Sequence, residues 1–120
     1  MKSRFTEKAE RALDISLSSA REMGHTYVGT EHILLGLLSV PDSVAYRILA
    51  DHGVTLSEIK ELIAASVGVG TPSAVAATNM TPMTKRIIEE SAYTARRLGS
   101  EKIGTEHILL ALIKDLDNVA

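Results

Sequence analysis

The heptapeptide Gly-Thr-Glu-His-Ile-Leu-Leu occurs twice in this chain of 120 residues, at residues 29–35 and again at residues 104–110. The duplication extends well beyond the heptapeptide, because a shift of 75 residues aligns residues 5–45 with residues 80–120 without a gap. Such a period is longer than that of the usual solenoid units, which is about 20–50 residues. We therefore predict a duplicated module whose two copies pack about a pseudo-two-fold axis, so that a site built in one copy recurs in the other.

The first helix of each copy has clear start and stop signals. Thr6 is a candidate N-cap, and the apolar residues that follow it recur at helical spacing as far as Gly24. In the second copy Thr81 precedes Pro82, which at the first helical position loses nothing by lacking an amide proton. That helix is expected to end at Gly99.

Further helix starts follow in both copies. They are marked by candidate caps at Thr30, Thr105 and Asp42 and by a capping box formed by Thr55 and Glu58. Glu31 and Glu106 fall in the first turn of their helices, where the exposed backbone amides favour a carboxylate. No segment alternates strictly between apolar and polar residues over a sustained length, so the sequence predicts an all-α fold.

The chain is expected to form a single domain (residues 1–120), with a first repeat at 5–66, a linker at 67–79 and an incomplete second repeat at 80–120. The linker is predicted because residues 68–78 are small and are punctuated by glycine and proline. The second copy stops where its third helix is expected to begin, so by analogy about twenty more residues would complete it. We therefore expect the chain to be an N-terminal excerpt of a longer protein.

Composition and charge exclude several classes of function. Thirteen basic and fifteen acidic residues leave a net charge of −2, whereas a general nucleic-acid binder normally carries a basic excess. The absence of cysteine excludes disulfides, thiolate catalysis and cysteine-based zinc sites. The longest apolar stretch, at residues 33–38, is too short to span a membrane, and the N-terminus is too polar for a secretory signal. We therefore expect a cytoplasmic protein that binds neither nucleic acid nor membranes.

The sequence also lacks the motifs of common enzymes. It contains neither the GxxxxGK[ST] phosphate loop nor the Gly-x-Ser-x-Gly elbow of serine hydrolases. Of the four histidines only His32 and His107 recur, and neither has a second histidine at i+4 to form a metal-binding face. We expect these two imidazoles to cap, pack or hydrogen-bond locally, and we predict no catalysis, metal or cofactor in this chain.

The recurring Thr-Glu pair admits two interpretations. In the first, the threonine caps the helix and the glutamate only complements the helix dipole. In the second, the carboxylates of Glu31 and Glu106 bind a ligand together with the exposed helix starts at Thr6 and Thr81, whose amides and hydroxyls can hold an anion. A carboxylate beside such amides would suit a ligand with a guanidinium at one end and a phosphate at the other. Spacing alone does not show that they are adjacent, so both interpretations stay open.

Residues 4–38, 80–99 and 103–112 together resemble the double N-terminal domain of the Clp AAA+ unfoldases that supply the ClpP protease. The resemblance is above all to the ClpC branch, since both copies carry Gly-Thr-Glu-His. It implies eight helices in two four-helix repeats, of which this chain would hold six and the start of the seventh. It also implies a module, attached flexibly to the hexameric ATPase ring, that receives adaptor proteins and unfolded or marked substrates. We expect the isolated chain to be a monomer. ATP and magnesium would bind only to other modules of the parent protein.

In ClpC proteins this domain also recognises phosphoarginine, a degradation mark, at two equivalent sites. The resemblance implies that Glu31 and Glu106 receive the guanidinium through charge-assisted hydrogen bonds. The other residues that it assigns are Thr6 and Thr81 beside the phosphate, Ile33 and Ile108 supporting the pocket walls, and Lys85 as a positive charge near the second site. Pro82 removes an amide donor from the second site, and Glu7 has no acidic counterpart there, so we expect the two pockets to differ in affinity.

Two functions are therefore compatible with the sequence. The first is a recognition domain that gathers phosphoarginine-marked substrates and adaptors for an ATP-driven protease. The alternative is an adaptor-docking or structural helical module, in which the two glutamates only complement helix starts.

Overall fold

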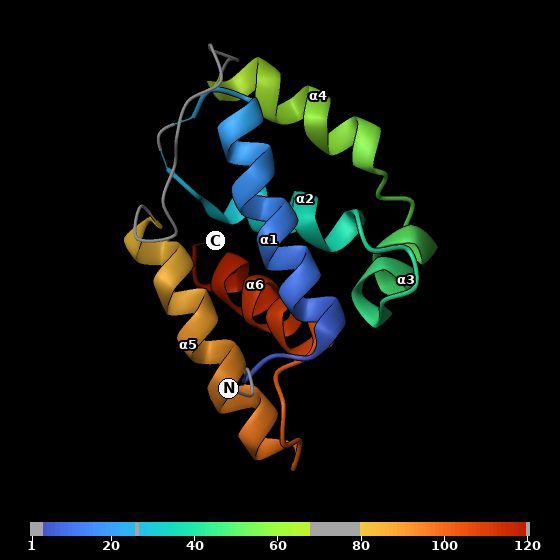
Figure 1. The fold of residues 1–120 in the computed structure, drawn as a ribbon, viewed down its shortest axis with the longest axis vertical. Helices are drawn as coiled ribbons and strands as arrows, with labels where there is room; N and C mark the ends of the chain where they lie inside the picture. The colour runs from blue at the N-terminus through green and yellow to red at the C-terminus, as the bar shows by residue number, and fades with distance from the viewer. Residues whose placement is uncertain (1–3, 26, 68–79, 120) are drawn as a thin grey trace.

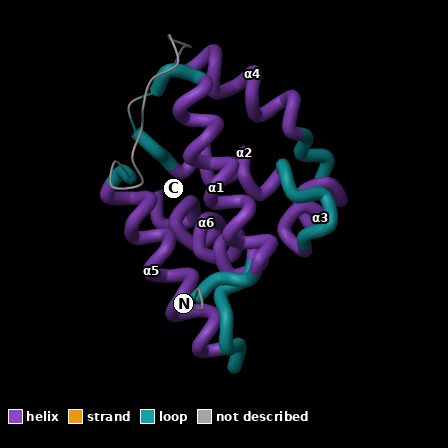
Figure 2. Tube along the Cα trace, in the orientation of Figure 1, coloured by secondary structure: helices purple, strands orange, loops and turns teal. Residues whose placement is uncertain are grey.

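The chain folds into helices in the computed structural model, which describes residues 4–25, 27–67 and 80–119 (Figure 1). In these ranges the helices are α1 (Glu7–Glu22), α2 (Thr30–Leu38), α3 (Val44–Asp51), α4 (Leu56–Val67), α5 (Pro82–Arg97) and α6 (Thr105–Val119). The described residues form no strand (Figure 2), only two isolated bridges. The predicted all-α fold is therefore confirmed, while residues 68–79 of the predicted linker lie outside the described part.

The predicted starts and stops of the two long helices are confirmed. Thr6 accepts a hydrogen bond from the amide of Ala9 at 3.2 Å, and Thr81 accepts one from the amide of Thr84 at 3.1 Å. Each hydroxyl satisfies one of the first-turn amides that a helix leaves unpaired. At the other end, Gly24 follows α1 with a φ of 74°, a left-handed conformation that favours glycine, and the equivalent glycine after α5 has a φ of 76°.

The starts of α2 and α6 differ from the prediction. Thr30 and Thr105 are the first residues of their helices rather than the caps, and Gly29 is the N-cap of α2. Glycine has no side chain to accept from the first-turn amides, but its own amide is paired, since Nδ1 of His32 accepts the amide proton of Gly29 at 2.9 Å. His107 does the same for the glycine before α6, at 2.8 Å. The local role expected for the two histidines is thus confirmed.

α3 is capped one residue later than predicted. Ser43, not Asp42, accepts the hydrogen bond from the amide of Tyr46, at 3.1 Å. Asp42 lies in the preceding turn, where its carbonyl oxygen accepts a hydrogen bond from Lys8 at 2.7 Å and its carboxylate lies 3.7 Å from the same ammonium. The capping box at the start of α4 is confirmed, since the amide of Glu58 donates to the hydroxyl of the threonine three residues before it, at 3.3 Å.

α6 continues past the point at which α2 ends. The third helix of the second repeat, expected to begin near the end of the chain, therefore does not begin within the described residues. α2 ends at Leu38, and Pro41 follows, which lacks an amide proton and clashes with the preceding turn of a helix. The equivalent residue of the second copy is Leu116, a good helix former, and α6 runs on to Val119.

The repeats are built from helix pairs, α1 with α2 and α5 with α6, and α2 and α6 also pack against each other (Figure 1). The core between them is aliphatic, as the scarcity of aromatic residues requires. Its fully buried members from both repeats include Ile33, Leu37, Val40, Ile87 and Ile108. Gly36 brings α1 and α2 into close contact, because a Cβ atom there would overlap the carbonyl oxygen of Ala12 and the hydroxyl of Ser16.

Candidate functional site

The two repeats contact each other crosswise at their helix starts. The amide of Thr81, before α5, donates to the carbonyl oxygen of Val28 at 3.1 Å, just before the first Gly-Thr-Glu-His motif. The amide of Thr6, before α1, donates to the carbonyl oxygen of Ile103 at 2.9 Å, just before the second motif. These hydrogen bonds are related by the same shift that aligns the repeats, so they form a symmetric pair. Each glutamate motif therefore lies beside the helix start of the other repeat.

We name these two assemblies the Glu31 site (Glu31 with the start of α5) and the Glu106 site (Glu106 with the start of α1). In both, the carboxylate folds back over the glycine before its helix: a Cβ atom on Gly29 or on Gly104 would overlap it. Gly29 has a φ of −100°, which any residue adopts, so the carboxylate and not the backbone requires glycine there. Neither carboxylate accepts a hydrogen bond from another described residue, which leaves both available to a ligand.

The Glu31 site is partly enclosed. The side chain of Glu31 is 32% exposed, and its Oε1 lies 3.7 Å from Nδ1 of His32. The ring of Tyr27 lies edge-on to that of His32, with centroids 5.5 Å apart, and burial together with the Glu31 charge raises the pKa of the Tyr27 hydroxyl. Glu31 also lines an apolar cavity of about 610 Å³ together with Met83, in the first turn of α5. The Glu31 region and the start of α5 therefore face the same cavity.

The Glu106 site is bounded instead by the turn before α3. Thr105, beside the glutamate, accepts a hydrogen bond from the amide of Ala45, at the start of α3, at 3.3 Å. Lys8 of α1 donates to the carbonyl oxygen of Asp42, in the turn before α3. The first turn of α1 carries Glu7 and Glu10, whereas the first turn of α5 carries no acidic residue. A phosphate would therefore meet more repulsion at this site than at the Glu31 site.

The two helix starts also offer different numbers of backbone donors. At α1 the amides of Glu7 and Lys8 precede the one that Thr6 caps. At α5 Pro82 has no amide proton, so only the amide of Met83 precedes the one that is capped. The start of α5 therefore has one backbone amide donor fewer than the start of α1, as expected from the sequence. It also has no acidic side chain in its first turn, so an anion meets less repulsion there.

Ile33 and Ile108, assigned to the pocket walls by resemblance, are 1% and 0% exposed. Both belong to the main core, so they support the starts of α2 and α6 from within. The surface around each carboxylate is formed by other residues.

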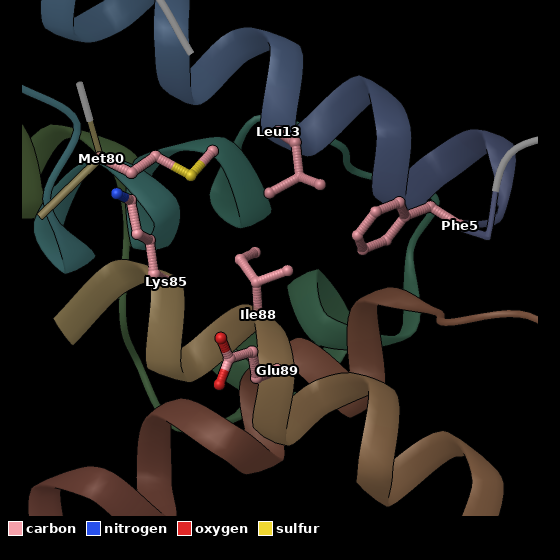
Figure 3. A pocket seen from close by; sticks show the side chains of 6 residues that line it. All are labelled: Phe5, Leu13, Met80, Lys85, Ile88 and Glu89. Atoms are coloured by element: carbon pink, nitrogen blue, oxygen red, sulfur yellow. The ribbon is translucent and has the colours of Figure 1, made fainter. Parts of the chain in front are cut away.

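Lys85 lies one turn into α5, at a groove between α1 and α5 (Figure 3). The groove has a volume of about 300 Å³ and is lined by Phe5, Leu13, Met80, Lys85, Ile88 and Glu89. Leu13 and Ile88 point toward each other across it from the two helices (Figure 3). The sequence analysis missed this groove, because its residues come from different repeats and no local pattern marks them.

The two glycines were also missed as site residues, although a signal was available. Glycine stands directly before Thr-Glu-His in both copies, at a place where other residues cap helices better. Its recurrence marks a steric requirement, which the structure assigns to the folded-back carboxylate.

The geometry favours binding over catalysis. Each site places a carboxylate acceptor near amide donors, which suits a ligand with a cationic and an anionic end. Among the described residues no group of three His, Asp or Glu side chains is placed to hold a metal ion. Within the same residues no helix is long and apolar enough to cross a membrane.

Comparison with known proteins identifies relatives along almost the whole chain. The family profile described as the Clp repeat (R) N-terminal domain matches residues 4–120. The chain is 41% identical over 117 residues to the chaperone protein ClpB of Oceanobacillus iheyensis and 38% identical over 117 residues to the chloroplastic chaperone protein ClpC2 of Arabidopsis thaliana. Both alignments cover 98% of this chain but only 14% and 12% of those relatives.

Solved structures agree with this result. The N-terminal domain of ClpD from Arabidopsis thaliana matches with a TM-score of 0.71 at 25% identity, over 91% of this chain and 75% of that one. The N-domain of ClpV in complex with a VipB peptide matches with a TM-score of 0.75 at 22% identity, over 95% of this chain and 70% of that one, and so shares the fold. With its profile match, its relatives and its fold in agreement, the chain belongs to the Clp repeat N-terminal domain family, the N-terminal domains of Clp ATPases.

Proposed function

We propose that this chain is a non-catalytic recognition domain of a ClpC-type unfoldase working with the ClpP protease, and that it binds phosphoarginine-marked proteins at the Glu31 and Glu106 sites. The proposal is carried by one observation, the crosswise contact between each glutamate motif and the helix start of the other repeat. A carboxylate accepts charge-assisted hydrogen bonds from a guanidinium, and the amides of a helix start stabilise a phosphate. A phosphoarginine side chain carries both groups a short distance apart, so one such side chain would use both halves of a site.

The remaining features of the proposal concern the parent protein. Because the chain spans 12–14% of the two relatives compared above, ATP and magnesium would bind to modules outside it. Substrates and adaptors would be received in the cytoplasm and passed to ClpP through the parent hexamer, with the isolated domain a monomer. The ClpC branch is proposed because both repeats carry the complete Gly-Thr-Glu-His motif.

The groove between α1 and α5 favours a second candidate function, the docking of an adaptor or substrate peptide without phosphoarginine recognition. Its apolar side chains, Leu13 and Ile88 among them, would take an apolar anchor, and Lys85 and Glu89 offer one charge of each sign. The N-domain of ClpV, which has this fold, was solved with a VipB peptide. This candidate predicts binding that does not depend on the two motif glutamates.

A titration with three matched peptides separates the two functions. The peptides carry phosphoarginine, arginine or phosphoserine at one position, and binding is followed by fluorescence anisotropy and by amide chemical shifts. We expect saturable binding of the phosphoarginine peptide alone, with shifts at residues 28–31 and 103–106. Equal binding of all three peptides, with shifts confined to the groove, would support peptide docking instead. A folded chain that binds none of them would contradict both functions.

Replacing both motif glycines, Gly29→Ala and Gly104→Ala, is expected to weaken phosphoarginine binding by about 10-fold or more. The added Cβ atoms displace the carboxylates of Glu31 and Glu106 from the positions that they occupy over the glycines. The fold should remain, because the displaced atoms are the ends of flexible side chains. Anisotropy titrations give the affinity, and thermal unfolding followed by circular dichroism gives the stability. Unchanged affinity would mean that ligand binding does not use the folded-back position.

A further inference from the structure

We propose that His32 and His107 are positioning residues for the two carboxylates, and that His25 orients the imidazole of His32. Each imidazole would hold the glycine turn over which the glutamate folds, and so keep the carboxylate in place for a ligand. The inference rests on the proposed function, because it concerns the same two sites.

The capping arrangement at these helices is the first argument. In the usual capping box a glutamate or glutamine at the third helical position accepts the amide proton of the N-cap residue. Here a histidine occupies that position, and Nδ1 accepts the amide proton at 2.9 Å for Gly29 and at 2.8 Å for Gly104. The glutamate at the preceding position is thereby released from a capping role. Its carboxylate packs over the same glycine without a hydrogen bond to it.

The hydrogen bonds also determine the tautomer of His32. Because Nδ1 accepts the amide proton of Gly29, the neutral ring carries its own proton on Nε2, which lies 2.7 Å from Nδ1 of His25. Both rings are buried, at 0% exposure for His32 and 6% for His25. The result is a chain of hydrogen bonds that runs from Gly29 through His32 to His25. The residue equivalent to His25 in the second copy is Ser100, so this support belongs to the Glu31 site.

The surroundings keep the His32 ring neutral. Tyr27 stacks on His25 with centroids 5.8 Å apart. The carboxylate of Glu31, 3.7 Å from Nδ1 of His32, favours the charged ring, but burial outweighs it. Burial, and secondarily the neighbouring His25, lower the pKa of His32 to about 4. A protonated ring would donate from Nδ1 and lose the ability to accept the amide proton of Gly29. Neutral His32 is therefore the form that holds the turn.

The test compares two substitutions of His32 in a chain that also carries Glu106→Ala, so that only the Glu31 site remains. His32→Asn keeps an acceptor oxygen near the position of Nδ1, and we expect the affinity for the phosphoarginine peptide to stay within about twofold. His32→Leu removes the acceptor and keeps an apolar side chain, and we expect a loss of about 3- to 10-fold, the effect of one neutral hydrogen bond. Equal affinities of the two variants would overturn the proposal.

A second readout needs no ligand. Three-bond scalar couplings across χ1 of Glu31 should report one rotamer in the parent chain and in His32→Asn, and averaging in His32→Leu. If the parent chain binds no phosphoarginine peptide, the proposed function fails, and these couplings alone decide whether His32 positions the glutamate. If His32→Leu does not fold, His25→Leu replaces it, and a single unchanged rotamer in that variant overturns the role of His25.

The pH profile tests the buried, neutral state of His32, which the ring needs in order to accept the amide proton of Gly29. The unfolded chain protonates its histidines near pH 6.5, whereas folded His32 takes up a proton only near pH 4. The unfolded state therefore binds more protons between these values, and stability is lost as the pH falls through this range. In His32→Asn that part of the pH dependence should be absent, as measured by denaturant unfolding at pH 7, 6, 5 and 4. An unchanged profile would contradict a buried neutral His32.

Discussion

Replacing Glu31 and Glu106 together by alanine is expected to abolish saturable binding of a phosphoarginine peptide while the chain stays helical. A charge-assisted hydrogen bond from a guanidinium to a carboxylate contributes about 1.5–3 kcal/mol, so each site should lose about 10- to 100-fold in affinity. The cost to the fold should be small, because neither carboxylate accepts a hydrogen bond within the described part of the chain. At each of the two helices the free energy of unfolding should fall only by the lost helix-dipole interaction, about 0.3–1 kcal/mol. Anisotropy titration and far-ultraviolet circular dichroism measure the two effects.

A matched control for this variant is Glu58→Ala. Glu58 is an exposed carboxylate in the first turn of α4, so its removal takes away one negative charge, as at each motif glutamate, at a helix start outside both sites. Its capping partner Thr55 still accepts the amide of residue 58. The control should bind the phosphoarginine peptide as the parent chain does. Retained binding in the double variant would rule out the glutamates as the recognition residues. Loss of helicity in the double variant would instead support the interpretation in which they only stabilise helix starts.

Gly36→Ala is expected to destabilise the fold by about 2 kcal/mol, with a decrease in Tm on the order of 5–10 °C. The added Cβ atom would overlap the backbone carbonyl oxygen of Ala12 on α1, and backbone cannot move aside as a flexible side chain can. Overpacking costs about 1–3 kcal/mol, and an overlap with backbone belongs at the upper end of that range. The helix propensity that alanine gains over glycine, about 1 kcal/mol, offsets part of it and leaves about 2 kcal/mol. Thermal and denaturant unfolding followed by circular dichroism measure the change.

Two glycine–alanine exchanges elsewhere serve as controls for Gly36→Ala. The residue equivalent to Gly36 in the second repeat is Ala111, which is buried, so the contact of α5 with α6 already accommodates a Cβ atom. Ala111→Gly, which creates no overlap, should cost about 1 kcal/mol of helix propensity and roughly 0.8 kcal/mol for the buried methyl group that is lost. Gly104→Ala should leave the stability close to that of the parent chain, because there the added atom meets the flexible carboxylate of Glu106. Equal stability of Gly36→Ala and the parent chain would mean that α1 and α2 do not cross as closely as described.

Much of the helical framework could be predicted from the sequence, because its signals are local. Thr6 and Thr81 cap the long helices as expected, and Thr55 with Glu58 opens α4. The errors occurred where two adjacent residues were plausible caps. In the structure Ser43, and not Asp42, caps α3. α2 and α6 begin after glycines whose amides donate to the imidazole three residues later, and Thr30 and Thr105 are not caps. Two of the side chains that were expected to cap have tertiary partners instead: the carboxylate of Asp42 lies 3.7 Å from the ammonium of Lys8, and the hydroxyl of Thr105 accepts the amide of Ala45.

The candidate site could be predicted only in part. The repetition of Gly-Thr-Glu-His singled out the two glutamates, and the caps singled out the two helix starts. Which glutamate lies beside which helix start does not follow from spacing. The structure shows that the pairing is crosswise, through the hydrogen bonds of Thr81 to Val28 and of Thr6 to Ile103. Ile33 and Ile108 belong to the core, and the groove that contains Lys85 has no signal in the sequence.

The sequence by itself therefore determined the all-α class, the duplication and the ends of most helices, since periodicity and capping depend on residues within one or two turns of each other. Only the tertiary structure decided that each glutamate lies beside the helix start of the other repeat and that a carboxylate folds over the glycine of each motif. It also decided that His32 has a hydrogen-bond partner in His25, for which the second copy has no counterpart. These features depend on atoms that are brought together by the packing of α1, α2, α5 and α6. Such contacts join residues far apart in the chain, and no local pattern records them.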